Sequence, residues 1–272
     1  MKDGMICVSH LTALDAAPEL FITAAANAGF TGVGLRVLPP RHAPLQYPVA
    51  VDPARCKALR MQADDLGITV FEAESFAMEA DASIETFLPG LEAGAVLGAS
   101  VLVSGAVDPD ETRLVENYAR LAEAAAEFGI TMAIEFMPSR PMKSLRDGLR
   151  VLNKVDHPNA RLLIDVLHLI RSGGTIEELA AVPEDKIAYV HLSDAPLAHP
   201  GQEGLTPESR AGRLYPGEGE LPLAALFSVL RSDIAVSLEA PHRDQQDLPP
   251  TERVRRAGAQ TLSFMRGIRA AA

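Results

Sequence analysis

The chain is organised by a regular alternation of short apolar runs with longer segments of helical spacing. Each run is nearly continuous in apolar residues, which is typical of parallel strands covered on both faces. We expect strands at residues 5–9, 32–37, 68–72, 100–104, 131–137, 162–166, 188–192 and 234–239. Eight such units in 272 residues leave about 34 residues per unit, the size of a βα repeat in a closed barrel. The pattern therefore predicts an α/β fold, a (β/α)8 TIM barrel.

Helical segments fill the gaps between these runs, at residues 18–28, 53–66, 110–128, 145–153, 175–181, 223–230 and 251–266. The first two begin with a proline and stop directly before Gly29 and Gly67, the usual asymmetry of helix ends. A doubly wound open sheet is the structural alternative, but no GxGxxG motif follows the first strand. No linker or low-complexity run divides the chain, so we expect a single domain over residues 1–272.

The amino-acid composition of the chain makes some classes of binding partner unfavourable. The chain has 36 acidic and 25 basic side chains, for a formal net charge of -11. Such a charge disfavours nucleic acid and anionic membrane surfaces as partners. The sequence also shows no signal-peptide pattern and no apolar run of the roughly 20 residues that a membrane span needs. With two cysteines outside any disulfide-type spacing, we expect a soluble cytoplasmic protein, and homo-oligomerisation stays open.

Four consecutive strand candidates end on side chains that can bind a metal. We call these residues the mouth cluster: Glu135, Asp165, His191 and Glu239. In a closed barrel the carboxyl ends of the strands meet at one mouth, where catalytic residues collect. Three carboxylates and one imidazole form a hard donor set that suits one Mn²⁺ or Mg²⁺ ion, with Co²⁺, Fe²⁺ and Zn²⁺ as alternatives. The competing interpretation is four ordinary polar residues at strand ends.

Two further residues are expected at the same mouth. His168 follows Asp165 at D-x-x-H spacing, where it could touch a substrate oxygen, and Arg213 lies in a long loop after the seventh strand candidate. An arginine there could bind a substrate hydroxyl, carboxylate or phosphate. Strand alternation cannot decide which other residues face the mouth without the register. Weaker candidates are His10, Arg36 and either Glu72 or Glu74.

The mouth cluster occurs together with three motifs: D-V-L-H (165–168), H-L-S-D (191–194) and R-L-Y-P-G-E-G (213–219). The combination resembles the xylose isomerase-like barrel superfamily, nearest to its sugar phosphate isomerase/epimerase group of ketose 3-epimerases and inosose dehydratases. The resemblance covers nearly the whole chain and implies one divalent metal held by the mouth cluster. It also implies that Glu135 and Glu239 move protons at the carbon next to a carbonyl. His168 and Arg213 would then hold the substrate.

The resemblance implies a metal-dependent isomerase or epimerase of a keto sugar or polyol, working by proton abstraction next to a carbonyl through a metal-bound enediolate. The alternative is a metal-dependent dehydratase, a lyase, of a cyclic keto-polyol such as 3-dehydroshikimate or inosose. The segments H-L-S-D-A-P (191–196) and P-G-E-G-E-L-P-L (216–223) resemble the dehydroshikimate branch. A barrel that only binds its ligand, without catalysis, is a third hypothesis.

Overall fold

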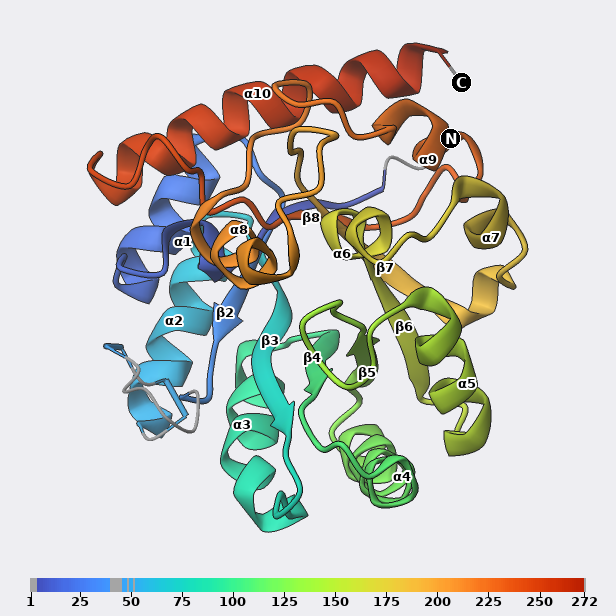
Figure 1. Cartoon of the computed structure of the whole chain (residues 1–272). Coiled ribbons are helices and arrows are strands. Elements are labelled where there is room, and N and C mark those ends of the chain that lie inside the picture. Colours follow the sequence, from blue (N-terminus) through green and yellow to red (C-terminus); the bar gives the residue numbers. More distant parts are fainter. Residues whose placement is uncertain (1–3, 40–45, 48, 51, 272) are drawn as a thin grey trace.

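Figure 1 shows a computed structural model of the chain, which describes residues 4–39, 46, 47, 49, 50 and 52–271. Eight parallel strands close into a barrel in chain order, which confirms the predicted (β/α)8 fold. The strands are β1 (Ile6–Val8), β2 (Gly32–Arg36), β3 (Thr69–Met78), β4 (Val101–Ala106), β5 (Thr131–Glu135), β6 (Ala160–Asp165), β7 (Ile187–Leu192) and β8 (Val236–Leu238). Each overlaps its predicted run, and only β3 continues well beyond it.

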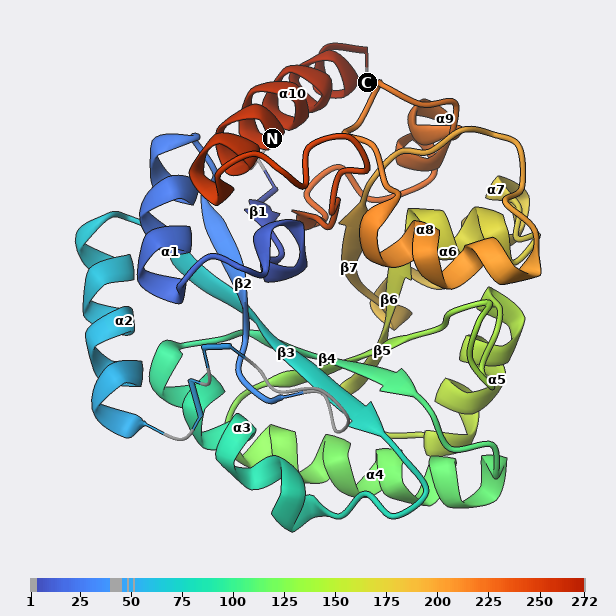
Figure 2. The same ribbon diagram turned by 60° about the vertical axis from the view of Figure 1, so that its left-hand side comes forward.

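Helices surround the strands on the outside of the barrel (Figures 1 and 2). They are α1 (Pro18–Asn27), α2 (Pro53–Asp65), α3 (Ile84–Leu97), α4 (Glu111–Glu127), α5 (Leu145–Val155), α6 (Val166–Arg171), α7 (Ile176–Ala180), α8 (Leu205–Ala211), α9 (Leu223–Ser228) and α10 (Pro250–Ala271). Three short 3-10 helices add to them: η1 (His10–Ala13), η2 (Glu184–Lys186) and η3 (Gln202–Gly204). The last helix, α10, packs on α1 and so joins the two ends of the helical ring.

The helix α3 was not predicted, because its sequence contains residues that usually break helices. Pro89 and Gly90 lie inside it, and Gly94 follows one turn later. The glycines allow close packing on the barrel. A Cβ at position 90 would lie 2.7 Å from Leu38 Cδ1, and one at position 94 would lie 3.3 Å from the Cβ of Ala73 on β3. Tertiary packing therefore outweighs local propensity here.

The strand register aligns the ends of the last strands. Asp165 on β6 pairs with His191 on β7, and His191 pairs with Ser237 on β8, two residues before Glu239. The helix α6 starts directly after β6, because the Asp165 carboxylate accepts the backbone N–H of His168 and caps the helix. The carboxyl ends of β6, β7 and β8 thus bring Asp165, His191 and Glu239 to the same end of the barrel.

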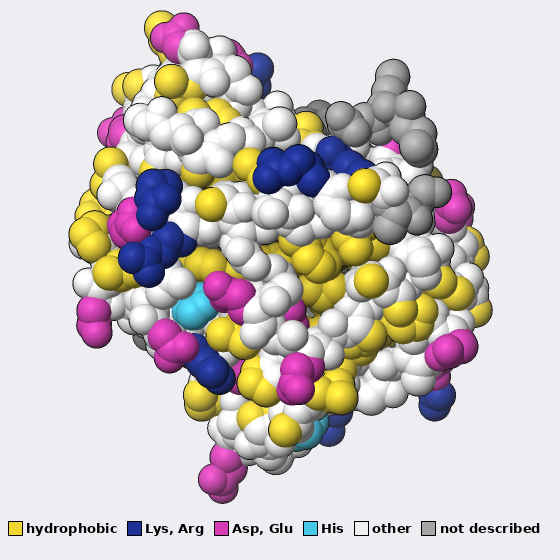
Figure 3. Space-filling view, turned by 90° about the horizontal axis from the view of Figure 1, so that it is seen from above, with side chains coloured by type: hydrophobic (Ala, Val, Ile, Leu, Met, Phe, Trp, Pro, Cys, Tyr) yellow, Lys and Arg dark blue, Asp and Glu magenta, His cyan; other side chains and the backbone are white. Residues whose placement is uncertain are grey.

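On the side that carries α10, acidic and basic side chains are interspersed with apolar ones (Figure 3). Within the described ranges, no helix combines the length and apolar character that crossing a bilayer requires.

Candidate metal site at the barrel mouth

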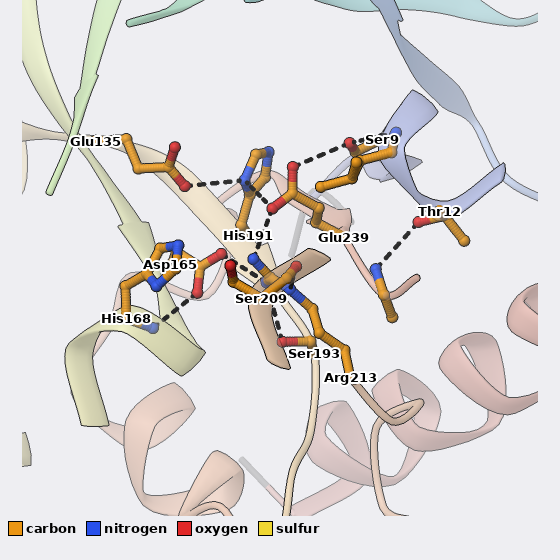
Figure 4. A network of polar contacts seen from close by, with 12 residues as sticks. Ser9, Thr12, Glu135, Asp165, His168, His191, Ser193, Ser209, Arg213 and Glu239 are labelled. Carbon is orange, nitrogen blue, oxygen red and sulfur yellow. Dashed lines mark hydrogen bonds and ion pairs between the residues drawn. The ribbon is translucent and has the colours of Figure 1, made fainter. Parts of the chain in front are cut away.

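The structure brings the four predicted metal ligands together. One ligand atom of each residue of the mouth cluster lies within 4.8 Å of the corresponding atoms of the others. All four residues are buried, and their side chains point toward one another (Figure 4). Four charged or titratable groups at this distance need a counter-charge, since buried carboxylates are otherwise destabilising.

Two buried atoms of the cluster lack a hydrogen-bond partner among the described residues: Glu135 Oε1 and His191 Nδ1. His191 Nδ1 lies 3.7 Å from Glu135 Oε1 and 3.6 Å from Glu239 Oε2, longer than a good hydrogen bond. Buried polar atoms are nearly always satisfied by protein, water or an ion. Unsatisfied oxygen and nitrogen atoms that converge on one point fit a divalent cation, so the residues present suit the expected metal.

The pKa shifts indicate that the cluster attracts positive charge. Burial raises the pKa of Glu135. Burial would lower the pKa of His191, but the negative charges of Glu239 and Glu72 outweigh it and hold that pKa well above its usual value. In the absence of a metal, the carboxylates therefore favour a proton on the imidazole. A divalent cation also supplies positive charge, and it takes the place of that proton when it binds.

Arg213 lies against the cluster rather than at a distance from it (Figure 4). Its Nη1 is 2.7 Å from Asp165 Oδ2 and its Nη2 is 2.9 Å from Glu239 Oε2, and its side chain is 1% exposed. Burial would raise the pKa of Asp165, but the charge of Arg213, with the nearby histidines, keeps that pKa below its usual range. The guanidinium is oriented further by the Ser193 hydroxyl and the Ser209 carbonyl.

The loop that carries Arg213 is held by Asp194, the last residue of the H-L-S-D motif. Its carboxylate accepts four backbone N–H groups, from Ala195, Gly217, Gly219 and Leu221. A Cβ at position 219 would lie 2.5 Å from the carboxylate, so the glycine lets the turn close on Asp194. This part of the motif shapes the loop and lies outside the mouth cluster.

His168 lies beside Asp165 at the start of α6, with its ring in the mouth (Figure 4). It is buried. The structure therefore places both predicted substrate contacts, His168 and Arg213, next to the mouth cluster.

The weaker candidates divide into two groups. Glu72 faces the barrel interior and its Oε2 lies 2.8 Å from His191 Nε2, so it contacts the cluster from behind. Glu74 also faces inward, 3.8 Å from Arg36, and burial together with the charge of Glu72 raises its pKa to about 7. The ring of His10 instead contacts backbone atoms, through Nε2 to Ala16 O and through Nδ1 to the N–H of Arg36.

Sequence reasoning did not find Tyr189. Its hydroxyl donates to Glu72 Oε2 over 2.9 Å. The spacing of Tyr189 and His191 could have indicated its position beside His191. The two residues are two positions apart on one strand, so their side chains face the same side of the sheet.

Residues 22–265 match the family model for the xylose isomerase-like TIM barrel. Curated relatives include the inosose isomerase of Bacillus subtilis, 28% identical over 160 residues (56% of this chain, 54% of that protein). A second is the 3-dehydroshikimate dehydratase of Pseudomonas putida, 27% identical over 120 residues (44% of this chain, 18% of that protein). A third is the L-ribulose 3-epimerase of a Methylomonas species, 30% identical over 116 residues (41% of this chain, 35% of that protein). The matched regions thus span about half or less of each relative.

Solved structures share the barrel over almost the full chain. The IOLI protein with a binding zinc atom gives a TM-score of 0.79 at 17% identity, covering 97% of this chain and 99% of that one. D-allulose 3-epimerase from a Methylomonas species, in complex with D-allulose, gives 0.70 at 18% identity, covering 98% of each chain. At these identities the likeness establishes the fold alone.

Proposed function

The chain belongs to the xylose isomerase-like TIM barrel family, and on that basis we propose that it is a divalent-metal-dependent isomerase or epimerase of a keto sugar or polyol. One observation carries the proposal: the mouth cluster, whose ligand atoms lie within 4.8 Å of one another. Relatives named inosose isomerase and L-ribulose 3-epimerase support the reaction class.

The mouth cluster would hold the metal, for which Mn²⁺ or Mg²⁺ is our first assignment and Co²⁺, Fe²⁺ or Zn²⁺ the alternatives. When bound, such an ion polarises a carbonyl and stabilises negative charge on oxygen as a neighbouring C–H bond is ionised. The protein contributes a dry and preorganised setting, because all four ligands are buried and Arg213 and Ser9 fix the two oxygens of Glu239.

Glu135 and Glu239 are our assignment for the proton transfers. They approach from different sides of His191 (Figure 4). Epimerisation needs two such groups, since one removes the proton and the other returns it on the opposite face of the substrate carbon. Burial raises the pKa of Glu135, which brings a carboxyl group toward the range where it can both accept and release a proton near neutral pH.

Arg213 and His168 are our assignment for substrate binding. The Arg213 guanidinium is already held by Asp165, Glu239 and the Ser209 carbonyl, so little freedom is lost when a remaining N–H meets a substrate oxygen. The His168 ring lies beside the cluster on the first turn of α6 (Figure 4). Both groups suit the oxygens of a sugar or polyol.

The second candidate is a dehydratase of a cyclic keto-polyol such as 3-dehydroshikimate or inosose. The match to a 3-dehydroshikimate dehydratase favours it. The same pair of carboxylates would serve, because elimination also begins with removal of a proton next to a carbonyl. The two reactions then differ only in whether the proton returns to carbon or a hydroxyl departs.

The test combines metal analysis with a substrate screen in D₂O. We expect about one equivalent of divalent metal in the purified protein, and loss of that metal in His191→Ala. An isomerase or epimerase incorporates solvent deuterium at one carbon of a keto sugar or inosose. A dehydratase converts 3-dehydroshikimate to a product that absorbs in the near ultraviolet. Metal-loaded protein that does neither across the panel would refute both candidates.

A further inference from the structure

A further buried carboxylate, that of Glu72, lies behind the mouth cluster on the far side of His191. Glu72 extends from β3 across the barrel, and its Oε2 is 2.8 Å from His191 Nε2 and 2.9 Å from the Tyr189 hydroxyl. The Tyr189 oxygen is itself 3.1 Å from His191 Nε2. Glu72 and Tyr189 are fully buried and His191 is 1% exposed. The three side chains form a closed triangle inside the barrel.

Neighbouring residues leave space for these three side chains and pack against them. Gly34 on β2 faces the side chains of both Glu72 and Glu74, and a Cβ there would lie 3.1 Å from Glu72 Cδ and nearer still to Glu74 Oε1. The Tyr189 ring packs edge-on against Phe71 with ring centres 5.1 Å apart, and against the His191 ring at 5.2 Å. Burying a carboxylate in this packed layer is unfavourable unless hydrogen bonds and positive charge compensate it.

The contacts of Glu72 determine which nitrogen of His191 carries the proton. Tyr189 donates its O–H to Glu72, so the carboxylate accepts, and His191 Nε2 must donate an N–H to the same oxygen. In a neutral imidazole the other nitrogen then carries a lone pair. That nitrogen is Nδ1, which faces Glu135 and Glu239. Within the described part of the chain it has no hydrogen-bond partner.

We propose that Glu72 and Tyr189 are positioning residues that hold His191 with Nε2 protonated and Nδ1 directed as a ligand into the metal site. The proposal rests on the metal site of the proposed function. Hydrogen bonds from a ligating histidine to a carboxylate fix its ring orientation and increase its basicity. Glu72 itself is not a ligand, because the cluster that could hold an ion comprises the four mouth residues without it.

The test is calorimetric titration of Mn²⁺ and Co²⁺ into metal-free wild type, Glu72→Gln and Tyr189→Phe. Glu72→Gln keeps the size of the side chain and removes its charge, and we expect roughly 10- to 100-fold weaker metal binding. Tyr189→Phe removes one donor to Glu72 and should weaken binding less. The visible spectrum of bound Co²⁺ should change in Glu72→Gln, because the orientation of the imidazole ligand is no longer fixed.

Glu74→Gln is the matched control, since Glu74 is a buried carboxylate on the same strand that contacts Arg36 and the backbone N–H of His10. All titrations are run above the Glu74 pKa of about 7, so that its carboxylate is ionised in the wild type. It should leave metal affinity within about threefold and the Co²⁺ spectrum unchanged. Equal weakening in both Gln variants would mean that only net charge matters, and unchanged affinity in Glu72→Gln would mean that Glu72 fills space. Either result overturns the positioning role while the metal site stands.

Failure of wild type to bind metal would overturn the metal site and, with it, this proposal. Unfolding of each metal-free variant in urea separates a stability defect from a binding defect. If Glu72→Gln does not fold, Tyr189→Phe decides the question, and an unchanged Co²⁺ spectrum and affinity in that variant contradicts the proposal.

Discussion

At the scale of single residues, Arg213 and the proposed cation share two carboxylates. Asp165 and Glu239 are both members of the mouth cluster and both bind the buried guanidinium. Each carboxylate has a second oxygen, which accepts from the His168 N–H in one case and from the Ser9 hydroxyl in the other. The single positive charge of Arg213 therefore neutralises only part of the negative charge of the mouth cluster, which still favours binding of a cation.

Arg213→Met should destabilise the metal-free protein and increase its response to metal. Two buried carboxylates lose their partner, which typically costs about 3–5 kcal/mol, and the uncompensated charge attracts a cation more strongly. Thermal unfolding with and without Mn²⁺ measures both effects. The Mn²⁺-induced rise in Tm should be larger than in wild type, with Arg213→Lys in between. An equal or smaller rise in Arg213→Met contradicts this account of the site.

Glu135→Gln should abolish proton transfer while keeping the shape of the site. We expect kcat/KM to fall by roughly 10²–10⁴-fold, because an amide can neither accept nor release the substrate proton. Metal content is measured in the same samples, since Glu135 is also a member of the mouth cluster. Glu127→Gln on the exposed face of α4 is the control. Activity of Glu135→Gln within tenfold of that control would rule out the catalytic assignment.

Sequence patterns predicted the mouth cluster because each member closes an apolar strand run, and that signal is local. Tyr189 and Glu72 could not be paired in this way. They lie on β7 and β3, which are not neighbours in the barrel, so their contact depends on strand tilt and register rather than on spacing. Arg213 was placed in the correct loop, but its bonds to Asp165 and Glu239 follow from the fold of that loop around Asp194.

At the scale of elements, the helix η1 depends on a neutral buried histidine. His10 Nδ1 accepts the Arg36 N–H and Nε2 contacts Ala16 O, so the imidazole bridges η1 to β2. Burial lowers the pKa of His10 from 6.5 to about 4. Between these values the unfolded chain takes up a proton that the folded protein excludes, and stability falls as pH decreases.

The His10 contribution should therefore be complete above pH 6.5 and lost progressively down to about pH 4, amounting to about 3 kcal/mol. Glu74 shifts in the opposite direction, with its pKa raised from 4.5 to about 7, so its contribution to the stability of the protein increases as pH falls across most of this interval. For this reason the measurement compares urea unfolding of wild type with His10→Gln, which retains Glu74. The free-energy difference between them should change with pH in favour of the variant on acidification. A pH-independent difference would show that His10 takes up its proton equally in the folded and unfolded states, and would contradict the lowered pKa.

A buried ion pair joins α6 to α8, the short helix within the loop that carries Arg213. Arg171 on α6 is 2% exposed in its side chain and lies 2.7 Å from Glu208 on α8. The next residue, Ser209, supplies the carbonyl that accepts from Arg213 Nε. The ion pair therefore links α6, which contains most of the D-V-L-H motif, to the loop that orients Arg213.

Glu208→Ala should lower the free energy of unfolding by about 3 kcal/mol, because Arg171 stays buried without its carboxylate. Its effect on catalysis should appear mainly in KM, since Ser209 on α8 orients Arg213, which we assign to substrate binding. Denaturant unfolding and steady-state kinetics measure the two effects. The exposed Glu203, a member of η3 in the same loop, provides the control Glu203→Ala. Equal behaviour of the two variants would exclude the linking role of the pair.

At the scale of the whole molecule, the mouth cluster is spread over four strands, so a bound ion should affect how cooperatively the barrel unfolds. The mouth cluster draws on β5, β6, β7 and the end of β8, while β1 pairs with both β8 and β2 and closes the barrel. We propose that residues 1–272 unfold as one domain. A cation bound to the native state then stabilises both halves of the barrel, including β1 to β4, which supply no ligand.

Chemical unfolding followed by two probes tests this proposal. Far-ultraviolet circular dichroism reports all helices, and the single labelled thiol of a Cys7→Ser variant reports Cys56 on α2, away from the mouth cluster. With free Mn²⁺ at 100 times its Kd, both transitions should shift together by about 2.7 kcal/mol. In His191→Ala, neither transition should respond to Mn²⁺. A shift of the circular dichroism transition alone would mean that the half with β1 to β4 unfolds independently of the half with β5 to β8. In that case α2 would melt at the same denaturant concentration with and without the ion.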